Sequence, residues 1–408
     1  MTIGNIIIYL SIFFFLYAGI LLFLVLLDNK NQIYKPKLKK NYSKVCIIVP
    51  CFNEEETIVK TVRSLLKLNY PKDKLEILVI DDGSIDKTYQ KAKSLEQYKQ
   101  IKVFHKKNGG KYTALNYGLT KTKAEFVGCL DADSFVAPNA LRLAMAKFKD
   151  SKTMCVTTSV KIYQPKSIVQ QIQGIEFILG IFLRKVFDFL NSITVAPGPF
   201  SIFRREVFSE LGPYRQGHNT EDLEIAFRMQ SKHYKIVNAP DACVHTIGPC
   251  SFRELWKQRK RWYHGLVRNA WDYKALMLNK KYGDLGLFVL PAIFFSVFIS
   301  IIINFYTIFW VNQEVVYRFA LWRLTGFSFN QLSLNINWFF LNTNPYIFLL
   351  TLLLGISIIT VLLGKRMSTE NDKIGKNFIF FLLFYGPLYF IWWMSAIFEV
   401  VFKKENKW

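Results

Sequence analysis

Two aspartates, Asp131 and Asp133, stand two residues apart in the stretch "EFVGCLDADS", where an apolar run ends in acids. Carboxylates at this spacing are hard oxygen donors that suit Mg²⁺ or Mn²⁺, and such an ion usually completes its shell with water and substrate phosphates. The same stretch also fits a turn in which Asp133 and Ser134 cap a following helix. The pattern alone leaves the metal site and the helix cap open.

Two other loops carry groups that could contact a nucleotide. In "DDGS", Asp81 and Asp82 end a second apolar run, although they also fit an acidic turn in which Asp86 caps the next helix. In "NGGKYTALNYG", a glycine pair leads into a helix with Lys111 in its first turn. Backbone N–H groups and an ammonium at a helix start can bind a phosphate or a base. A purely structural turn fits the same residues.

A third acidic segment, "NTEDLEIAFRMQ", has the pattern of a helix start. Thr220 fits the N-cap position, and Glu221 and Asp222 are favourable in the first turn. Capping therefore accounts for both acids. Near a metal and a diphosphate, however, a carboxylate here could serve as the general base for a sugar hydroxyl.

The stretch "QRKRW" lies in a helical pattern just before a long apolar run. Gln258, Arg261 and Trp262 fall on one helix face, where an amide, a guanidinium and an indole can bind phosphate oxygens and stack on a sugar ring. Arg259 and Lys260 are predicted to point elsewhere, toward lipid headgroups. Nucleic-acid binding is not expected, because no recognition fold accompanies the charge.

The elements that must position these groups alternate between strands and helices. Strands are predicted at "KVCIIVP", "LEILVIDDGS", "IKVFH" and "EFVGCLDADS", with helices over residues 54–68, 86–97, 110–120 and 139–148. This alternation predicts an α/β domain with a mostly parallel sheet covered on both faces. Ligands bind such sheets at the carboxyl ends of the strands, where the four loop aspartates are expected.

Apolar runs flank this domain in a chain of 408 residues, 51% of them hydrophobic, with a net charge of +23. Residues 3–27, 285–310, 346–364 and 377–398 contain no Asp, Glu, Lys or Arg. Each run is about as long as the roughly 20 residues that cross a bilayer core. The sequence therefore predicts a multi-pass membrane protein. A cleaved signal peptide is disfavoured, because the first run is long and lacks a basic start.

Lysines after the first run set the expected orientation. Positions 30, 35, 37, 39, 40 and 44 are all Lys, so the positive-inside rule places the N-terminus outside and the α/β domain in the cytoplasm. Three further spans would leave the tail "KKENKW" outside, against the same rule. Either residues 311–344 contain a re-entrant or interfacial element, or one apolar run does not cross. The six cysteines lack ligand-like spacing and are expected to be reduced.

These patterns divide the chain into five parts. Residues 1–28 form an N-terminal transmembrane helix, and residues 29–43 form a basic juxtamembrane linker. The α/β domain covers residues 44–250, and amphipathic interfacial helices cover residues 251–283. Residues 284–408 form a C-terminal transmembrane region of about three spans.

Taken in order, "VPCFNEEETI", "IDDGS", "NGGKYTALNYG", "LDADS", "NTEDLEIAFRM" and "QRKRW" resemble the family-two glycosyltransferases of GT-A fold. The chain is most similar to the membrane-embedded processive branch, which comprises poly-N-acetylglucosamine, hyaluronan, chitin and cellulose synthases. The loop "PGPFS" departs from the cellulose-synthase pattern and looks closer to the hyaluronan and N-acetylglucosamine polymer enzymes.

The resemblance implies a role for each matching position. For the donor nucleotide it implies Asn53, Glu54, Asp81 or Asp82, Lys111, Asp131, Gln258 and Arg261. Asp131 and Asp133 would engage Mg²⁺ or Mn²⁺, and Asp222, with Glu221 beside it, would be the catalytic base. The acceptor sugar would lie on Trp262 and on the loop of Gly198, Pro199, Phe200 and Ser201.

The implied activity is inverting transfer from a UDP-sugar, most favourably UDP-GlcNAc, to build a β-linked polysaccharide processively, with possible export. The implied partners are the donor, a growing glycan or lipid acceptor, the bilayer and a possible small membrane accessory subunit. The alternative is transfer of one sugar to a membrane lipid, as in ceramide glucosyltransferases, which carry a similar motif.

Overall fold

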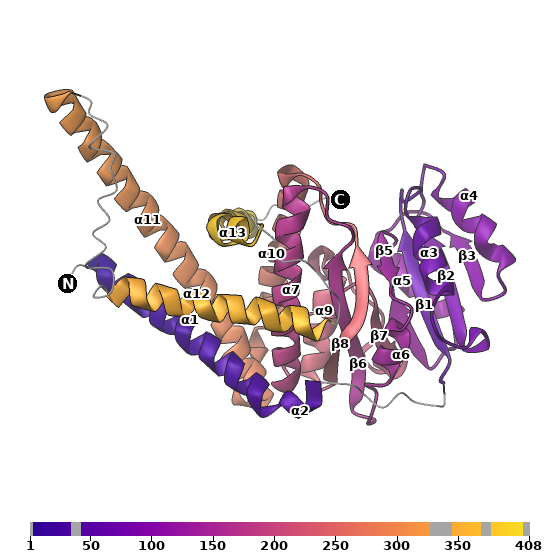
Figure 1. The fold of residues 1–408 in the computed structure, drawn as a ribbon. Helices are drawn as coiled ribbons and strands as arrows, with labels where there is room; N and C mark the ends of the chain where they lie inside the picture. Colours follow the sequence, from indigo (N-terminus) through magenta and orange to yellow (C-terminus); the bar gives the residue numbers. More distant parts are fainter. Residues whose placement is uncertain (1–2, 34–41, 327–344, 369–376, 403–408) are drawn as a thin grey trace.

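The computed structural model describes residues 3–33, 42–326, 345–368 and 377–402, and the predicted basic linker falls largely outside these ranges. An eight-stranded mixed sheet forms the centre of the α/β domain, in the order β3-β2-β1-β4-β7-β6-β8-β5 (Figure 1). Its parallel half contains the strands β1 (Val45–Cys51), β2 (Leu75–Asp81), β3 (Ile101–His105) and β4 (Phe126–Cys129). All four strands match the predicted positions.

Strand β1 shows why this half of the sheet is stable. Alternate side chains point to opposite faces, so Ile47 packs with helix α3 (Ile58–Leu66) and Ile48 packs with helix α5 (Lys111–Lys121). Every residue of β1 is buried, as expected for a parallel strand with helices on both faces. Because these four strands are parallel, their carboxyl ends lie at the same edge of the sheet.

The other half of the sheet departs from the predicted parallel order. Strand β7 (Ser201–Arg204) runs antiparallel to β4 and to β6 (Thr153–Ile162), whereas β8 (Lys235–Thr246) runs parallel to β6. The short strand β5 (Ser134–Val136) pairs antiparallel with β8. Two further helices cover this half: α8 (Glu206–Leu211) and α9 (Glu221–Ser231).

Three of the predicted helices are shorter in the structure. Helix α3 begins at Ile58 rather than at residue 54, and the Glu54 N–H before it donates to the Thr88 hydroxyl at 2.7 Å. Helix α4 (Thr88–Lys93) continues as a 3-10 turn to Gln97. Helix α6 (Ala140–Met145) has Asn139 at its N-cap position.

Two long helices lie between the sheet and the apolar helices. These are α7 (Ile168–Phe189), which begins with a Ser167–Gln170 capping box, and α10 (Phe252–Asp272), which carries the predicted "QRKRW" segment. Helix α7 contacts β6 and β8 on one side and the apolar helices on the other. Figure 1 shows α10 next to α7, and the interfacial position of α10 stays a prediction.

Four helices are long and apolar enough to cross a membrane: α1 (Ile3–Asp28), α11 (Leu290–Thr325), α12 (Pro345–Met367) and α13 (Asn377–Val401). A π-helical turn at Leu285–Val289 leads into α11, which continues past the expected end at residue 310. The rest of the predicted re-entrant segment, 327–344, lies outside the described residues. All six cysteines are free, and five of them are buried.

Candidate active site

One ammonium group joins two of the acidic loops. The Lys111 Nζ atom lies 2.6 Å from Asp131 Oδ1 and 2.9 Å from Glu221 Oε1. Burial alone would lower the pKa of Lys111, but the charges of Asp131 and Glu221 outweigh burial and hold it well above its usual value. Lys111 is therefore a permanent cation between the loop after β4 and the start of α9.

The two acids at the start of α9 differ in their protonation. Burial and the charge of Glu221 raise the pKa of Asp222 to about 6, although Lys111 and Arg261 act in the opposite direction. Burial would also raise the pKa of Glu221, but its contact with Lys111 leaves that pKa below its usual value. Glu221 is therefore an ionised partner of Lys111, whereas Asp222 titrates near the range in which a general base works best.

Thr220 occupies the predicted N-cap position of α9 but does not cap the helix with its side chain. Its hydroxyl donates to the Gly217 carbonyl at 2.7 Å and accepts from the Asn269 amide at 3.0 Å. The capping role predicted for Thr220 is wrong, because these contacts join the start of α9 to α10 instead. Glu221 and Asp222 are left facing the site.

The helix-cap interpretation of Asp133 and Ser134 is also wrong. These residues lead into strand β5, and α6 begins only at Ala140. The Asp133 carboxylate accepts hydrogen bonds from Ser134 at 3.0 Å and from Thr246 at 3.3 Å. Burial and the nearby charges of Asp131 and Glu54 raise its pKa to about 7.

Asp131 and Asp133 fit a hard divalent cation. They are two carboxylates whose mutual repulsion a 2+ ion would relieve, and oxygen is the donor that Mg²⁺ and Mn²⁺ prefer. Within the described ranges, no group of three or more His, Cys, Asp or Glu side chains is arranged to hold a metal. Water and substrate phosphates would therefore have to complete the shell.

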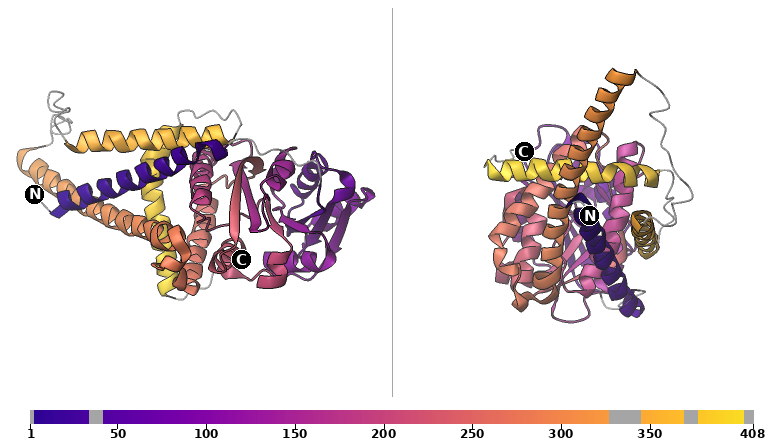
Figure 2. Two further views of the ribbon diagram at one scale, coloured as in Figure 1. Left: turned by 90° about the horizontal axis from the view of Figure 1, so that it is seen from below. Right: turned by 90° about the vertical axis from the view of Figure 1, so that its left-hand side faces the viewer.

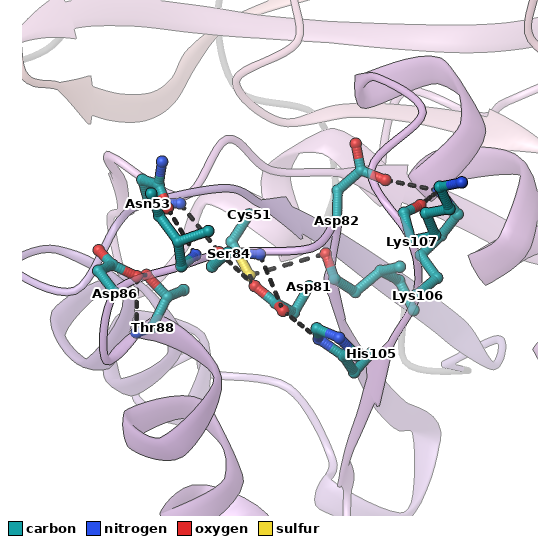
Figure 3. Close-up of polar contacts among 12 residues, drawn as sticks. Cys51, Asn53, Asp81, Asp82, Ser84, Asp86, Thr88, His105, Lys106 and Lys107 are labelled. Carbon is teal, nitrogen blue, oxygen red and sulfur yellow. Dashed lines mark hydrogen bonds and ion pairs between the residues drawn. The ribbon is translucent and has the colours of Figure 1, made fainter.

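The first two loops interlock at the far end of the site (Figure 3). Asn53 has a left-handed backbone with φ of 55°, its N–H donates to the Ser84 hydroxyl at 2.9 Å, and its side chain accepts from Ile85 N–H at 3.0 Å. The Asp86 carboxylate accepts from Thr88 N–H at 2.9 Å, at the start of α4. Lys87 holds the N-cap position of α4, so Asp86 accepts the Thr88 N–H from one residue before that position.

Asp81 and Asp82 point in opposite directions from the end of β2 (Figure 3). Asp81 is fully buried and pairs with His105 Nδ1 at 2.5 Å. Asp82 accepts from Lys106 Nζ at 2.5 Å and from Gly110 N–H at 2.8 Å. Asp82 therefore orients the glycine loop that leads to Lys111, a supporting role that the sequence did not predict. Direct contact of either acid with uridine stays a prediction.

The acceptor loop predicted at 198–201 lies against the same centre. A Cβ atom added to Gly198 would lie 2.5 Å from Lys111 Nζ and 2.9 Å from Asp131 Oδ2. Gly198 and Ser201 line a small pocket together with Glu221 and Asp222. Phe200, in contrast, is completely buried in the core, so it supports the loop from below.

Helix α10 brings Arg261, one of its three predicted groups, close to the two acids of α9. Arg261 Nη1 donates to the Asn219 carbonyl at 2.9 Å. Its positive charge favours the ionised form of both Glu221 and Asp222, although burial and Glu221 still raise the pKa of Asp222. The Gln258 Oε1 atom is buried with no hydrogen-bond partner among the described residues. Trp262 is partly buried on the same helix.

The predicted direction of Arg259 is wrong, whereas Lys260 is partly exposed and its direction stays a prediction. Arg259 is completely buried, its guanidinium pairs with Glu176 of α7 at 2.6 Å, and its carbon lies 4.1 Å from the Trp262 ring centroid. Lys260 pairs with Glu399 of α13 at 2.6 Å. Arg259 does not face lipid headgroups, because α7 and α13 cover its side of α10.

Sequence reasoning missed Arg184 of α7. Its Nη1 atom donates to the Thr158 carbonyl at 3.3 Å, and burial lowers its pKa to about 10 while the charge of Asp222 partly offsets this. The available signal was the pair Arg184 and Lys185 inside the apolar stretch "GIFLRKVF". Arg184 thus places a cation within the electrostatic reach of Asp222.

Proteins of known function resemble this chain in sequence. Residues 46–212 match the sequence profile described as Glycosyl transferase family 2. A poly-beta-1,6-N-acetyl-D-glucosamine synthase of Staphylococcus epidermidis is 32% identical over 239 residues, which cover 56% of this chain and 57% of the relative. A synthase of the same name from Staphylococcus aureus is 31% identical over 246 residues, or 58% of each. The chain thus spans little more than half the length of these curated relatives.

A solved structure shares the fold. A mannosyltransferase from Pyrobaculum calidifontis, in complex with GDP-Man and Mn²⁺, aligns with a TM-score of 0.57 and 19% identity. The alignment covers 89% of this chain and 99% of that one. This likeness confirms the predicted GT-A fold with flanking apolar helices.

Proposed function

We propose that this glycosyltransferase, whose residues 46–212 form a glycosyl transferase family 2 domain, synthesises a β-linked polysaccharide at the membrane from UDP-GlcNAc. The observation that supports this proposal most strongly is that Asp131 and Glu221 both contact Lys111, with Asp222 beside them. The names of the two staphylococcal relatives support N-acetylglucosamine as the transferred sugar. Processive addition and export beside the apolar helices are part of the proposal.

The reaction follows from the different states of Glu221 and Asp222. Asp222 accepts the proton of the acceptor hydroxyl as that oxygen attacks the anomeric carbon of the donor. The bond from the anomeric carbon to the UDP oxygen breaks at the same time, so an α-linked donor gives a β-linked product. Lys111 and Arg261 stabilise the negative charge that develops on the departing diphosphate.

Asp131 and Asp133 would hold Mg²⁺ or Mn²⁺, because their hard oxygens and mutual repulsion suit a divalent cation. When bound, the ion neutralises diphosphate charge and so assists departure of UDP. Lys111 pairs with Asp131, one of these two acids, so a residue of the protein already neutralises part of their charge. The protein therefore supplies one fixed cation and two ligands for a second.

The remaining predicted residues divide between donor and acceptor. In the proposal, Asn53, Glu54 and either Asp81 or Asp82 form the uridine end, and Gln258 and Arg261 contact the diphosphate. Trp262 stacks under the terminal acceptor sugar, beside the loop at 198–201. The catalytic domain faces the cytoplasm of a cell whose membrane holds the apolar helices, and a small accessory subunit is a further proposed partner.

Product sizing tests this proposal. Membranes containing the protein are supplied with radiolabelled UDP-GlcNAc, UDP-glucose or UDP-glucuronate, and both UDP release and product length are measured. We expect polymer from UDP-GlcNAc alone. One discrete lipid band would show single transfer to a lipid instead, and polymer from another donor would overturn the sugar assignment. Asp222→Asn supplies the inactive control.

A further inference from the structure

Both ends of α13 contact helices that belong to the catalytic side of the molecule. Near its start, Phe381 packs with Ile175 and Ile178 of α7. In its last turns, Glu399 pairs with Lys260 of α10 at 2.6 Å, and the Val400 carbonyl accepts from Arg268 at 3.5 Å. The ends of α13 are therefore anchored to the same layer.

Helices α7 and α10 in turn are fixed to the α/β domain. Lys185 of α7 donates to the Asn238 carbonyl of β8 at 3.4 Å, and Asn269 of α10 donates to the Gly217 carbonyl at 2.9 Å. A helix of 25 residues is about 37 Å long at roughly 1.5 Å per residue. Such a helix, if it crossed the roughly 30 Å hydrocarbon core, would hold only one end at this layer.

The direction of α13 agrees with its contacts. Figure 1 shows α13 along its own axis, whereas α12 lies in the plane of the view. In both views of Figure 2, α13 again runs across the direction of α12. Helix α13 also crosses over α10, with the fully buried Ala396 on its inner side. It lies on the side of α7 and α10 that faces the other apolar helices (Figure 1).

The residues of α13 suit the boundary of a membrane better than its centre. The helix contains two tryptophans, Trp392 and Trp393, and one acid, Glu399. Its mean hydropathy is 1.6, against 2.7 to 2.8 for the other three apolar helices. Glu399 and both tryptophans face the protein, and the exposed face is apolar: Ile379, Leu383, Phe384 and Phe398. A helix with a polar residue on one face and only apolar residues on the other is typical of a membrane interface.

We propose that α13 lies in the plane of the membrane, on the leaflet next to the catalytic domain, with its apolar face against lipid. Of the described helices, α1, α11 and α12 then cross, and α13 does not. The proposal also satisfies the positive-inside rule. Lysine and arginine residues precede α13 at 365, 366, 373 and 376 and follow it at 403, 404 and 407. With α13 in the plane of the membrane, both groups lie on the same side of the membrane as the lysines at 30–44.

Cysteine labelling in intact cells tests this arrangement. Single cysteines are introduced as Asp372→Cys before α13 and Asn406→Cys after it, in the full chain with Cys250→Ser. Ser333→Cys between α11 and α12 provides a marker for the opposite side, and native Cys250, which is exposed, marks the catalytic side. Each is treated with a membrane-impermeant maleimide before and after the cells are opened.

We expect positions 372 and 406 to label like Cys250, and position 333 to label oppositely. Labelling of 372 and 406 from different sides would overturn the proposal, because it would show that α13 crosses. The result is read relative to Cys250, so it does not depend on the sugar or the reaction. A failure of the proposed enzymatic function therefore leaves this test intact.

Discussion

The guanidinium of Arg259 lies over the ring of Trp262, with its carbon 4.1 Å from the ring centroid. Glu176 of α7 fixes this guanidinium through an ion pair of 2.6 Å, and Trp392 of α13 lies 5.9 Å from it on another side. Cation–π contacts of this kind gain strength when water is excluded. One face of Trp262 is therefore covered by Arg259, which contacts α7 and α13, and in the proposed function the acceptor sugar stacks on the other face.

Removing this support should impair acceptor use and spare the donor. In Arg259→Gln, Trp262 loses its stacked partner, and Glu176 keeps no cation. Because small displacements of positioning groups cost up to about 100-fold in rate, we expect kcat to fall about 10- to 100-fold while UDP affinity is unchanged. Rates of elongation and calorimetric UDP binding measure the two effects.

Two companion variants separate positioning from loss of folding. Arg259→Lys keeps the charge but not the planar stack, so it should recover part of the rate. Arg253→Gln, at an exposed position in the first turn of the same helix, should behave like the parent. Equal losses of UDP binding and rate in Arg259→Gln would contradict a positioning role.

Asp222→Asn should abolish transfer and leave donor binding in place. The amide keeps the size of the side chain but cannot accept the proton, and general-base catalysis contributes about 10²- to 10⁴-fold. Transfer is measured as UDP release, and donor binding by calorimetry. Glu210→Gln, at an exposed acid outside the site, is the matched control. Turnover in Asp222→Asn close to that of the parent would remove Asp222 as the base.

Much of this site was predictable because its motifs end strands. Asp81, Asp82, Asp131 and Asp133 were placed at the carboxyl edge from the alternation of strands and helices alone, and β1 to β4 lie where that alternation put them. Local patterns suffice there, since a buried parallel strand leaves few alternatives for its neighbours. Strand β7 was not predicted, because its antiparallel pairing with β4 joins residues about 75 positions apart.

The errors on α10 have a different physical origin. A helical wheel correctly grouped Gln258, Arg261 and Trp262, but it could not show that α7 and α13 cover the remaining faces. Arg259 is buried because Glu176, 83 positions earlier in the chain, neutralises it. A charge run near a membrane is usually solvated, and only the tertiary partners reveal the exception.

The raised pKa of Asp222 predicts an acid limit on activity. A base must be deprotonated, so kcat/KM should be constant above about pH 6 and fall about tenfold per pH unit below it. An aspartate at its ordinary value would lose activity only near pH 4. Initial rates between pH 4.5 and 8, in buffers of constant ionic strength, give the profile.

Arg184→Gln tests the cause of that profile. The charge of Arg184 interacts with Asp222, so its removal should move the acid limb to higher pH and leave the rate at high pH largely intact. A limb that stays in place would show that Arg184 does not act on Asp222. A lower rate at every pH would show a structural role instead.

Metal removal should also reveal the roles of Asp131 and Asp133. Treatment with a chelator should abolish transfer, and excess Mg²⁺ or Mn²⁺ should restore it. Asp133→Asn should raise the metal concentration for half-maximal activity at least about tenfold, since it removes one of two charged ligands. Calorimetric UDP binding with and without metal provides a readout apart from turnover. Full activity in the chelator would rule out a metal at this site.

Gly198→Ala should disrupt the centre of the site by adding a single methyl group. Its Cβ would lie 2.5 Å from Lys111 Nζ and within 3.0 Å of both Asp131 oxygens, closer than non-bonded atoms approach. Either the loop or the Lys111–Asp131 pair must move, so we expect kcat to fall about 100-fold. Gly180→Ala on α7 is the matched control, because its Cβ would meet nothing within 4 Å and alanine favours a helix. Equal activity of the two variants would show that the loop at 198–201 is not part of the catalytic centre.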